Sequence, residues 1–277
     1  VIDVIAPPGE ARPSPPPPEA HPLVKELWES LQSLSPKNFQ EVYHDAFADK
    51  ETLQTLYDLG LVSLRDRALA EEIFYHIARR VQAIAQNLPY VPDELEDLEK
   101  LLADKLVCNF SVFQSLPDAW AIHQLFPVVP LSRLLEPPTR RATLVDISCD
   151  SDGKMDRFID LHDVRQTLPV HPVRPGEPYY LGVFLVGAYQ DVLGSNHNLF
   201  GQVGEAHVRV EEEGFAIERF VGGETAERVI EKMGFTAREL MLGVERLVRR
   251  SRLSPAEKGA FLERYARELQ GYTYLED

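Results

Sequence analysis

The chain has 277 residues, of which 44% are hydrophobic and 26% are charged, enough for one large or two modest globular domains with buried cores. Acidic residues outnumber basic ones by 44 to 29, giving a formal net charge of −15. A field of that sign repels phosphate groups, so we expect neither nucleic acid nor a membrane surface as a partner. No apolar run approaches the ~20 residues that span a bilayer. Two cysteines are too few for a disulfide framework, and we expect a cytoplasmic protein.

The first 22 residues combine a short strand pattern with a proline-rich linker. Residues 1–5 (VIDVI) alternate like a strand. Because a lone strand is unstable in water, we expect it to join a sheet formed by later residues or by residues upstream of this chain. Residues 6–22 are rich in proline and predict a stiff, extended linker without a core-forming pattern. The missing initiator methionine suggests processing or truncation before Val1.

Residues 23–105 predict a helical bundle. Apolar side chains recur there at three- and four-residue spacing, the period of one helix face. They include Leu23, Leu27, Leu31, Leu69, Ile73, Ile77 and Val81. Ser35, followed by a proline, predicts the N-cap of a second helix, which Gly60 ends. Ser63 is expected to begin a third helix, and Pro92 a fourth.

The pattern changes to short strands in residues 106–223. Six runs are rich in Val, Ile, Phe and Tyr and are bounded by Gly, Pro or Asp, which is typical of a β-barrel or a β-sandwich. These runs are VCNFSVF, ATLVDIS, KMDRFID, YYLGVFLVG, AHVRV and FAIERF. Residues 224–277 are helical again, with a capping box formed by Thr236 and Glu239 and a last helix capped by Ser254. The predicted fold class is α+β: a helical bundle, a β domain and C-terminal helices.

The segment SCDSDG, residues 148–153, follows an apolar strand and ends at a glycine turn. One thiol and two nearby carboxylates match neither zinc nor EF-hand spacing. Two interpretations stay open. In the first, the segment is a polar turn whose Asp side chains bind nearby backbone N–H groups. In the second, Cys149 gives a proton to a carbanion while the adjacent carboxylate holds a cationic group of a substrate.

A second segment places Gly187 and Ala188 at the end of an apolar strand, directly before Tyr189. Glycine there lets a ligand approach the backbone, and a tyrosine hydroxyl binds phosphate well. The alternative is an ordinary strand-to-helix corner with a half-buried tyrosine. No Walker or dinucleotide-binding motif is present. For His197 a role as base or ligand competes with a surface or capping role, and the pattern favours the latter.

Several long segments resemble the C-terminal part of the biosynthetic arginine decarboxylases, a family of pyridoxal-phosphate enzymes with the alanine-racemase-like fold. The matching segments are residues 103–131, 146–160, 184–201 and 271–277. The resemblance implies an N-terminal (β/α)8 barrel that holds the cofactor on a lysine. Neither the barrel nor that lysine has a counterpart in this chain, which resembles the helical insert, the β domain and the helical tail of the family.

The resemblance also implies roles for four residues. Cys149 resembles the acid that reprotonates the α-carbon of the substrate after carbon dioxide leaves. Asp150 resembles the carboxylate that binds the guanidinium group of L-arginine, with Asp152 assisting. Tyr189 resembles the tyrosine beside the phosphate of pyridoxal 5′-phosphate. The family further implies a homodimer or higher oligomer with shared active sites, and it is associated with Mg2+, for which the sequence shows no carboxylate cage.

The function implied is conversion of L-arginine to agmatine and CO2 by a carboxy-lyase of polyamine (spermidine) biosynthesis. It requires a barrel part, either joined to this chain or supplied by a separate chain. Two alternatives stay open: a non-catalytic dimerisation or regulatory module derived from the family, and a sister decarboxylase acting on lysine or ornithine. Retention of Cys149, Asp150 and Tyr189 favours the catalytic interpretation, because a purely structural module needs none of them.

Overall fold

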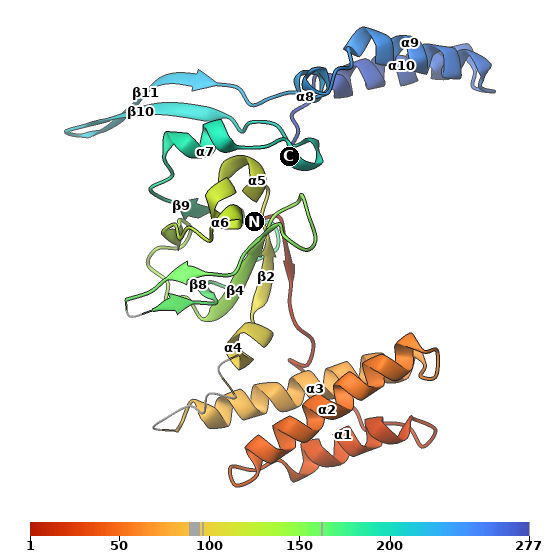
Figure 1. Cartoon of the computed structure of the whole chain (residues 1–277), viewed down its shortest axis with the longest axis vertical. Helices are drawn as coiled ribbons and strands as arrows, with labels where there is room; N and C mark the ends of the chain where they lie inside the picture. Colours follow the sequence, from red (N-terminus) through yellow and green to blue (C-terminus); the bar gives the residue numbers. More distant parts are fainter. Residues whose placement is uncertain (89–94, 96, 162, 277) are drawn as a thin grey trace.

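The computed structural model describes residues 1–88, 95, 97–161 and 163–276. Its elements form three tiers along the longest axis of the molecule: a helical bundle at one end, a mixed sheet in the middle, and a β-hairpin with the C-terminal helices at the other end (Figure 1). The N-terminus lies beside the middle tier (Figure 1). Two separate clusters of buried apolar side chains fill the bundle and the sheet region. The bundle therefore has a core of its own, as its helical periodicity predicted.

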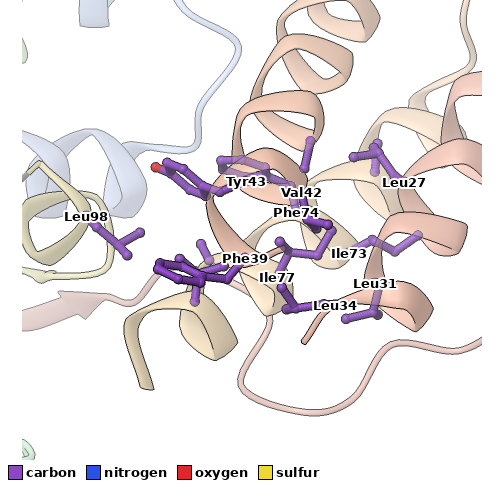
Figure 2. Close-up of a cluster of buried hydrophobic side chains, with 14 of the residues drawn as sticks. Leu27, Leu31, Leu34, Phe39, Val42, Tyr43, Ile73, Phe74, Ile77 and Leu98 are labelled. Atoms are coloured by element: carbon purple, nitrogen blue, oxygen red, sulfur yellow. The ribbon is translucent and has the colours of Figure 1, made fainter. Parts of the chain in front are cut away.

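The bundle consists of three helices, α1 (Pro22–Ser33), α2 (Phe39–Asp58) and α3 (Leu64–Ala85). Their apolar faces meet in one cluster, in which the Phe74 side chain is fully buried and its ring stacks on Tyr43 at a centroid distance of 6.2 Å. Each fully buried side chain of this size contributes about 1.5–3 kcal/mol. Figure 2 shows this cluster, to which the three helices contribute Leu27, Leu31, Phe39, Val42, Tyr43, Ile73, Phe74 and Ile77, together with Leu34 directly after α1.

Local signals at the ends of α2 and α3 are confirmed. Gly60 has a φ of 74°, a left-handed conformation that suits glycine, and it follows the end of α2. The Ser63 side chain accepts a hydrogen bond from the backbone N–H of Asp66 and caps α3. The predicted helix start at Pro92 lies outside the described residues. A short helix, α4 (Leu98–Leu101), follows that segment.

The predicted N-cap at Ser35 is wrong. Helix α2 begins at Phe39, and its N-cap is Asn38. The backbone N–H and the hydroxyl of Ser35 both donate to the side-chain oxygen of Asn38, at 2.8 and 2.7 Å. The serine oxygen is therefore engaged in a turn that precedes the helix, because a nearby amide side chain competes for it.

The central sheet has five strands. Strand β1 (Asp3–Ile5) pairs antiparallel with β2 (Asp104–Val107), so the VIDVI segment joins a sheet formed by later residues of the chain. Strand β2 pairs parallel with β4 (Arg140–Val145), which also pairs antiparallel with β5 (Lys154–Met155) and β8 (Leu168–Val170). The C-terminal end of β4 leads directly into residues 146–153.

The remaining strands form three two-stranded sheets. These pairs are β3 (Val128–Pro130) with β9 (Leu181–Val183), β6 (Phe158–Ile159) with β7 (Val164–Arg165), and β10 (Glu205–Glu211) with β11 (Gly214–Val221). In place of the expected barrel or sandwich, the chain forms one mixed five-stranded sheet and three small two-stranded sheets. Among the described strands, no pairing closes the five-stranded sheet into a barrel. The run VCNFSVF is a strand only as far as Val107, because Ser111 caps a helix, α5 (Val112–Ser115).

The proline-rich linker is held against both the bundle and the sheet. Gly9 has a φ of 83°, and a side chain there would come within 2.7 Å of the backbone nitrogen of His76 on α3. The Arg140 guanidinium donates to both carboxylate oxygens of Asp104, at 2.9 and 2.7 Å, and to Glu10 of the linker at 2.6 Å. The Asp104 side chain is buried and that of Glu10 is exposed, so the Arg140 guanidinium joins a buried carboxylate of the sheet to the exposed linker.

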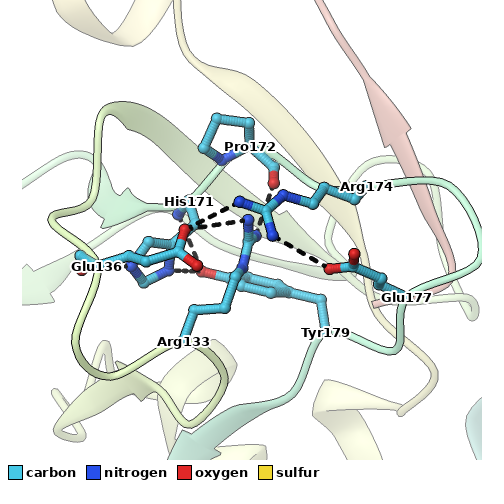
Figure 3. A network of polar contacts seen from close by, with 7 residues as sticks. All are labelled: Arg133, Glu136, His171, Pro172, Arg174, Glu177 and Tyr179. Carbon is cyan, nitrogen blue, oxygen red and sulfur yellow. Dashed lines mark hydrogen bonds and ion pairs between the residues drawn. The ribbon is translucent and has the colours of Figure 1, made fainter.

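A polar network ties the loop after β3 to the loop after β8 (Figure 3). The buried ring of His171 contacts the hydroxyl of Tyr179 at 2.9 Å and the backbone oxygen of Glu136 at 2.8 Å. The guanidinium of Arg133 lies over the Tyr179 ring at 5.2 Å, and Arg174 donates to the Glu136 carboxylate at 3.0 Å. These contacts fix the start of β9, the strand that leads toward Tyr189.

The C-terminal region contains α7 (Ala188–Leu193), α8 (Ala226–Lys232), α9 (Ala237–Arg250) and α10 (Pro255–Leu269). The capping box expected at Thr236 and Glu239 is present at the start of α9, and Ser254 caps α10 as expected, where it also forms a capping box with Glu257. The two helices pack against each other and project from the body of the molecule (Figure 1). Within the described ranges, no helix is both long enough and apolar enough to cross a membrane.

Candidate functional site

The loop that carries Cys149 is organised by one buried carboxylate, Asp146, at the end of β4. Its two oxygens accept hydrogen bonds from the backbone N–H groups of Val112 and Ser148, each at 2.8 Å. They also accept from the Ser148 hydroxyl at 2.5 Å and from the Cys149 N–H at 3.4 Å. Sequence reasoning did not assign Asp146 a role. The available signal was an acidic residue directly after an apolar strand, where a carboxylate has to be hydrogen-bonded if it is buried.

Gly153 closes the loop. Its N–H donates to the backbone oxygen of Cys149 at 2.9 Å, and its own oxygen accepts from the N–H of Asp146 at 2.7 Å. A Cβ atom at this position would overlap a carboxylate oxygen of Asp146 and come within 2.5 Å of the Cys149 oxygen. Glycine is therefore required here by a close approach of two backbone segments and one buried side chain.

The Ser151 hydroxyl oxygen lies 3.6 Å from the sulfur of Cys149. Hydrogen bonding to the sulfur, with the backbone N–H of Asp152 as the largest influence and the side chains of Ser151 and His197 next, lowers the pKa of the Cys149 thiol to about 7. By contrast, burial raises the pKa of Cys108 to about 11. Cys149 is therefore the more reactive of the two free thiols near neutral pH.

The segment around His197 packs directly on this loop. The Asn198 side chain donates to the backbone oxygen of Ser148, next to Cys149. The His197 ring also packs on Phe113 of α5, with 4.3 Å between ring centroids. The sequence pattern favoured a surface or capping role for this histidine. Its side chain is exposed, and the contact of Asn198 with Ser148 brings together two motifs that lie about fifty residues apart in the sequence.

The other three predicted site residues are exposed. Asp150 and Asp152 lie in the Cys149 loop with their side chains open to solvent. Asp152 also lines a small cavity of about 160 Å³ whose wall includes Trp120. Tyr189, in the first turn of α7, is 78% exposed, so it is not the half-buried corner residue of the alternative interpretation. In the described part of the chain, no hydrogen bond or ring contact joins Tyr189 to the Cys149 loop.

The residues fit part of a pyridoxal-phosphate site. The Tyr189 hydroxyl has no hydrogen-bond partner among the described residues, and a Cβ atom at Gly187 beside it would meet nothing within 4 Å. An anionic phosphate therefore has access to this hydroxyl. Across the described residues, no group of three or more His, Cys, Asp or Glu side chains is placed to hold a metal ion.

Comparisons with known proteins identify the family that the chain resembles. The family model described as the arginine decarboxylase helical bundle domain matches residues 17–99, and that of the arginine decarboxylase C-terminal helical extension matches residues 226–275. The biosynthetic arginine decarboxylase of Deinococcus radiodurans is 55% identical over 264 residues, 93% of this chain and 40% of the relative. That of Nostoc sp. is 43% identical over 281 residues, 99% of this chain and 41% of the relative.

The crystal structure of the biosynthetic arginine decarboxylase from Campylobacter jejuni aligns with a TM-score of 0.80 and 30% identity, over 99% of this chain and 44% of that protein. This chain matches the C-terminal part of the biosynthetic arginine decarboxylases. The resemblance seen in the sequence is thereby confirmed, and so is the α+β class. The chain spans about 40% of the length of the arginine decarboxylases it matches, and the expected (β/α)8 barrel of that family lies outside it.

Proposed function

We propose that this chain is the part of a pyridoxal-phosphate-dependent arginine decarboxylase that supplies the proton donor and the substrate carboxylates. The observation that carries the proposal is the Cys149 thiol, held by the Asp146-ordered loop among donors that lower its pKa to about 7. The similarity to proteins named biosynthetic arginine decarboxylase supports L-arginine as the substrate. The reaction would release CO2 and form agmatine, at the head of polyamine biosynthesis in the cytoplasm.

The chemistry assigned to Cys149 is a proton transfer to carbon. Pyridoxal phosphate, when bound, supplies an electron sink for the electron pair that CO2 leaves behind on the α-carbon. The Sγ–H of Cys149 then gives its proton to that carbon: the S–H bond breaks, a C–H bond forms, and a thiolate remains. The N–H groups of Ser151 and Asp152 stabilise this thiolate. A thiol with a pKa of about 7 is about half protonated at neutral pH, which suits a general acid.

The basic end of the substrate would meet the two exposed carboxylates of the same loop. A carboxylate binds a guanidinium through two parallel hydrogen bonds, which an ammonium group cannot reproduce. We assign this contact to Asp150, with Asp152 assisting from the edge of the small cavity that Trp120 also lines. An indole face beside a carboxylate adds a favourable surface for a planar cation.

Cofactor binding would involve Tyr189 and residues outside this chain. The exposed Tyr189 hydroxyl would donate to the phosphate of pyridoxal phosphate. The lysine that attaches the cofactor would come from the barrel part, either joined to this chain or supplied as a separate chain. Large exposed apolar side chains near Tyr189 and on the β10–β11 hairpin favour such a partner, since patches of this kind are normally covered. They include Phe184, Leu185, Val192, Val208, Val210, Phe215 and Ile217.

We also propose a homodimer in which the Cys149 loop of one subunit completes the active site of the other. The exposed position of Asp150 and Asp152 supports this arrangement, because both carboxylates are accessible from outside the chain. Size measurement of the protein containing the barrel part, followed by mixing of Cys149→Ala subunits with subunits inactivated in the barrel, tests it. Shared sites predict recovery of activity in the mixture, whereas sites built within one subunit predict none.

The experiment that tests the function is CO2 release from L-arginine, L-lysine and L-ornithine by the protein that contains this chain and its barrel part, loaded with pyridoxal phosphate. We expect arginine to be preferred, and Cys149→Ala to lower kcat by about a hundredfold, the usual scale of a lost general acid. Cys108→Ala is the matched control and should keep its turnover. Asp150→Asn should raise the KM for arginine by about tenfold through the lost charge pair, without weakening cofactor binding.

Three results would contradict the proposal. An unchanged rate and product after Cys149→Ala would remove the acid role. A preference for lysine or ornithine would favour a sister decarboxylase. Absence of decarboxylation with all three substrates, in a protein that binds its barrel part, would favour the non-catalytic dimerisation or regulatory module.

A further inference from the structure

Helix α7, which carries Tyr189, is held by polar rather than apolar contacts. Among its six residues, all of them described, Gln190 alone is buried, with 4% of its surface exposed, whereas Val192 is 80% exposed. This reverses the usual order, in which apolar side chains are buried and amide side chains face water. A buried amide is costly unless it is hydrogen-bonded, so the partners of Gln190 determine how α7 is held.

Both polar groups of the Gln190 side chain bind one residue, Asp118 of α6 (Pro117–Ala121). The amide nitrogen donates to the Asp118 carboxylate at 2.6 Å, and the amide oxygen accepts from the backbone N–H of Asp118 at 3.1 Å. Two bonds to the same residue restrict rotation as well as distance, and the one to a carboxylate is of the stronger, charge-assisted kind. The pair therefore fixes the orientation of α7 on α6.

The C-terminal end of α7 is fixed to α5. The N–H of Ser195 donates to the backbone oxygen of Phe113 at 3.0 Å, and a Cβ atom at Gly194 would come within 2.4 Å of the backbone oxygen of Gln114. The three short helices α5, α6 and α7 thus lie against one another (Figure 1). Only the Gln190 pair, however, holds the part of α7 that adjoins Tyr189.

Helix α6 has apolar anchors of its own, which α7 lacks. Leu116, directly before α6, is buried, and the Trp120 ring packs on the buried Phe113 ring with 5.1 Å between centroids. Loss of the pair between the two helices should therefore release α7 and leave α6 in place. Tyr189 would move with α7, because its side chain is exposed and its placement follows that of the helix.

We propose that Gln190 is a positioning residue for the cofactor phosphate. It anchors α7 to α6 and thereby holds the Tyr189 hydroxyl where the phosphate of pyridoxal phosphate would bind. The buried Gln190 side chain does not itself reach that group, so it acts through its neighbour. This inference rests on the proposed function, because the phosphate contact of Tyr189 belongs to it, and it adds two residues, Gln190 and Asp118, to which that proposal gives no role.

The first measurement follows the contact itself and needs neither cofactor nor substrate. In the protein that contains this chain and its barrel part, Gln190→Met removes both hydrogen bonds at similar side-chain volume. The backbone N–H of Asp118 lies in the first turn of α6, where no intrahelical acceptor exists. We expect its hydrogen exchange, followed by mass spectrometry, to be about tenfold faster in the variant. Gln86→Met, on the exposed surface of the bundle, is the matched control and should leave the exchange of α6 unchanged.

The second measurement is the affinity for pyridoxal phosphate, by spectroscopic titration. Gln190→Met should weaken binding about tenfold, as loss of the Tyr189 hydroxyl would. In a Tyr189→Phe background the same substitution should cause no further loss, because the group that Gln190 positions is already gone. At saturating cofactor, the KM for arginine should be unchanged, since α6 and Trp120 stay in place.

A third measurement tests the pair by exchanging its groups. Gln190→Glu removes the amide donor and places a second carboxylate against Asp118, so cofactor affinity should fall again by about tenfold. Adding Asp118→Asn supplies an amide donor to the new carboxylate, which restores a side-chain hydrogen bond of reversed direction. We expect this double variant to recover most of the affinity, a result that general misfolding cannot produce.

Several results would overturn the inference. Unchanged exchange of the Asp118 N–H in Gln190→Met would refute the contact, and wild-type cofactor affinity despite faster exchange would refute the positioning role. An equal further loss in the Tyr189→Phe background, or no recovery in the double variant, would indicate a merely structural role. Failure of the proposed function is distinguishable: a wild-type protein that binds the cofactor without decarboxylating arginine would refute that function alone, whereas one that binds no cofactor would refute both.

Discussion

Substitution of Gly153 by alanine perturbs the Cys149 loop at its closest approach. The added methyl group would overlap a carboxylate oxygen of Asp146 and lie 2.5 Å from the backbone oxygen of Cys149. Neither neighbour is the free end of a flexible side chain, because Asp146 is buried and held by four hydrogen bonds. The loop therefore has to move away from the end of β4.

The expected loss in the free energy of unfolding follows from the hydrogen bonds that this movement breaks. One Asp146 oxygen accepts from the N–H groups of Ser148 at 2.8 Å and of Cys149 at 3.4 Å, and this is the oxygen that the methyl group would displace. A hydrogen bond to a charged group contributes about 1.5–3 kcal/mol, and the longer one contributes less. We expect Gly153→Ala to lower the free energy of unfolding by about 2–4 kcal/mol. The thiol should also lose the N–H groups of residues 151 and 152, so its alkylation near pH 7 should slow.

Urea denaturation monitored by circular dichroism measures the stability, and iodoacetamide labelling measures the thiol. The matched control is Gly243→Ala, in the interior of α9, where a Cβ atom would meet nothing within 4 Å. There alanine should stabilise the helix by about 1 kcal/mol, the opposite sign. A Gly153→Ala protein as stable as the wild type, with an unchanged alkylation rate, would refute our account of how Asp146 orders the loop.

Three further substitutions test other contacts. Arg140→Met should lower the free energy of unfolding by about 3 kcal/mol, because it leaves the buried carboxylate of Asp104 unpaired. The double variant Arg140→Met, Asp104→Asn should recover part of that stability, and a double variant no more stable than Arg140→Met would refute the role of the unpaired charge. Phe74→Ala should cost about 3–5 kcal/mol in a thermal melt, whereas the half-exposed Phe47→Ala should cost far less, and equal losses would contradict the bundle packing. Tyr189→Phe should weaken pyridoxal-phosphate binding about tenfold by spectroscopic titration, at unchanged melting temperature; unchanged affinity would remove the phosphate contact.

The elements that could be predicted from sequence are those governed by local signals. Thr236 and Ser254 cap their helices as expected, since each finds its glutamate partner three residues later. Ser35 carried a similar signal, but Asn38 nearby competes for its hydroxyl and shifts the helix start. The strand predicted beyond Val107 fails because Ser111 caps α5 instead.

The candidate site was predictable only in part, for a related reason. Cys149 stood out as a residue type in an unusual segment, but its reactivity depends on contacts that no sequence period reports. Asp146 binds the N–H of Val112, 34 residues earlier, and Asn198 binds Ser148, 50 residues earlier. Such pairings arise only when β4, α5 and the loop after α7 are assembled, so they become visible only in the folded chain.

The proline-rich linker, residues 6–22, affects what hydrogen exchange and limited proteolysis can report on this molecule. Proline has no amide hydrogen, so much of residues 6–22 gives no signal in hydrogen exchange, although Gly9 packs on α3 beside His76. The bond after Arg12 precedes a proline, and trypsin cleaves such bonds poorly. Limited tryptic digestion should therefore leave β1 joined to α1, so that a sheet strand and the first helix of the bundle stay in one fragment even after other exposed loops are cut.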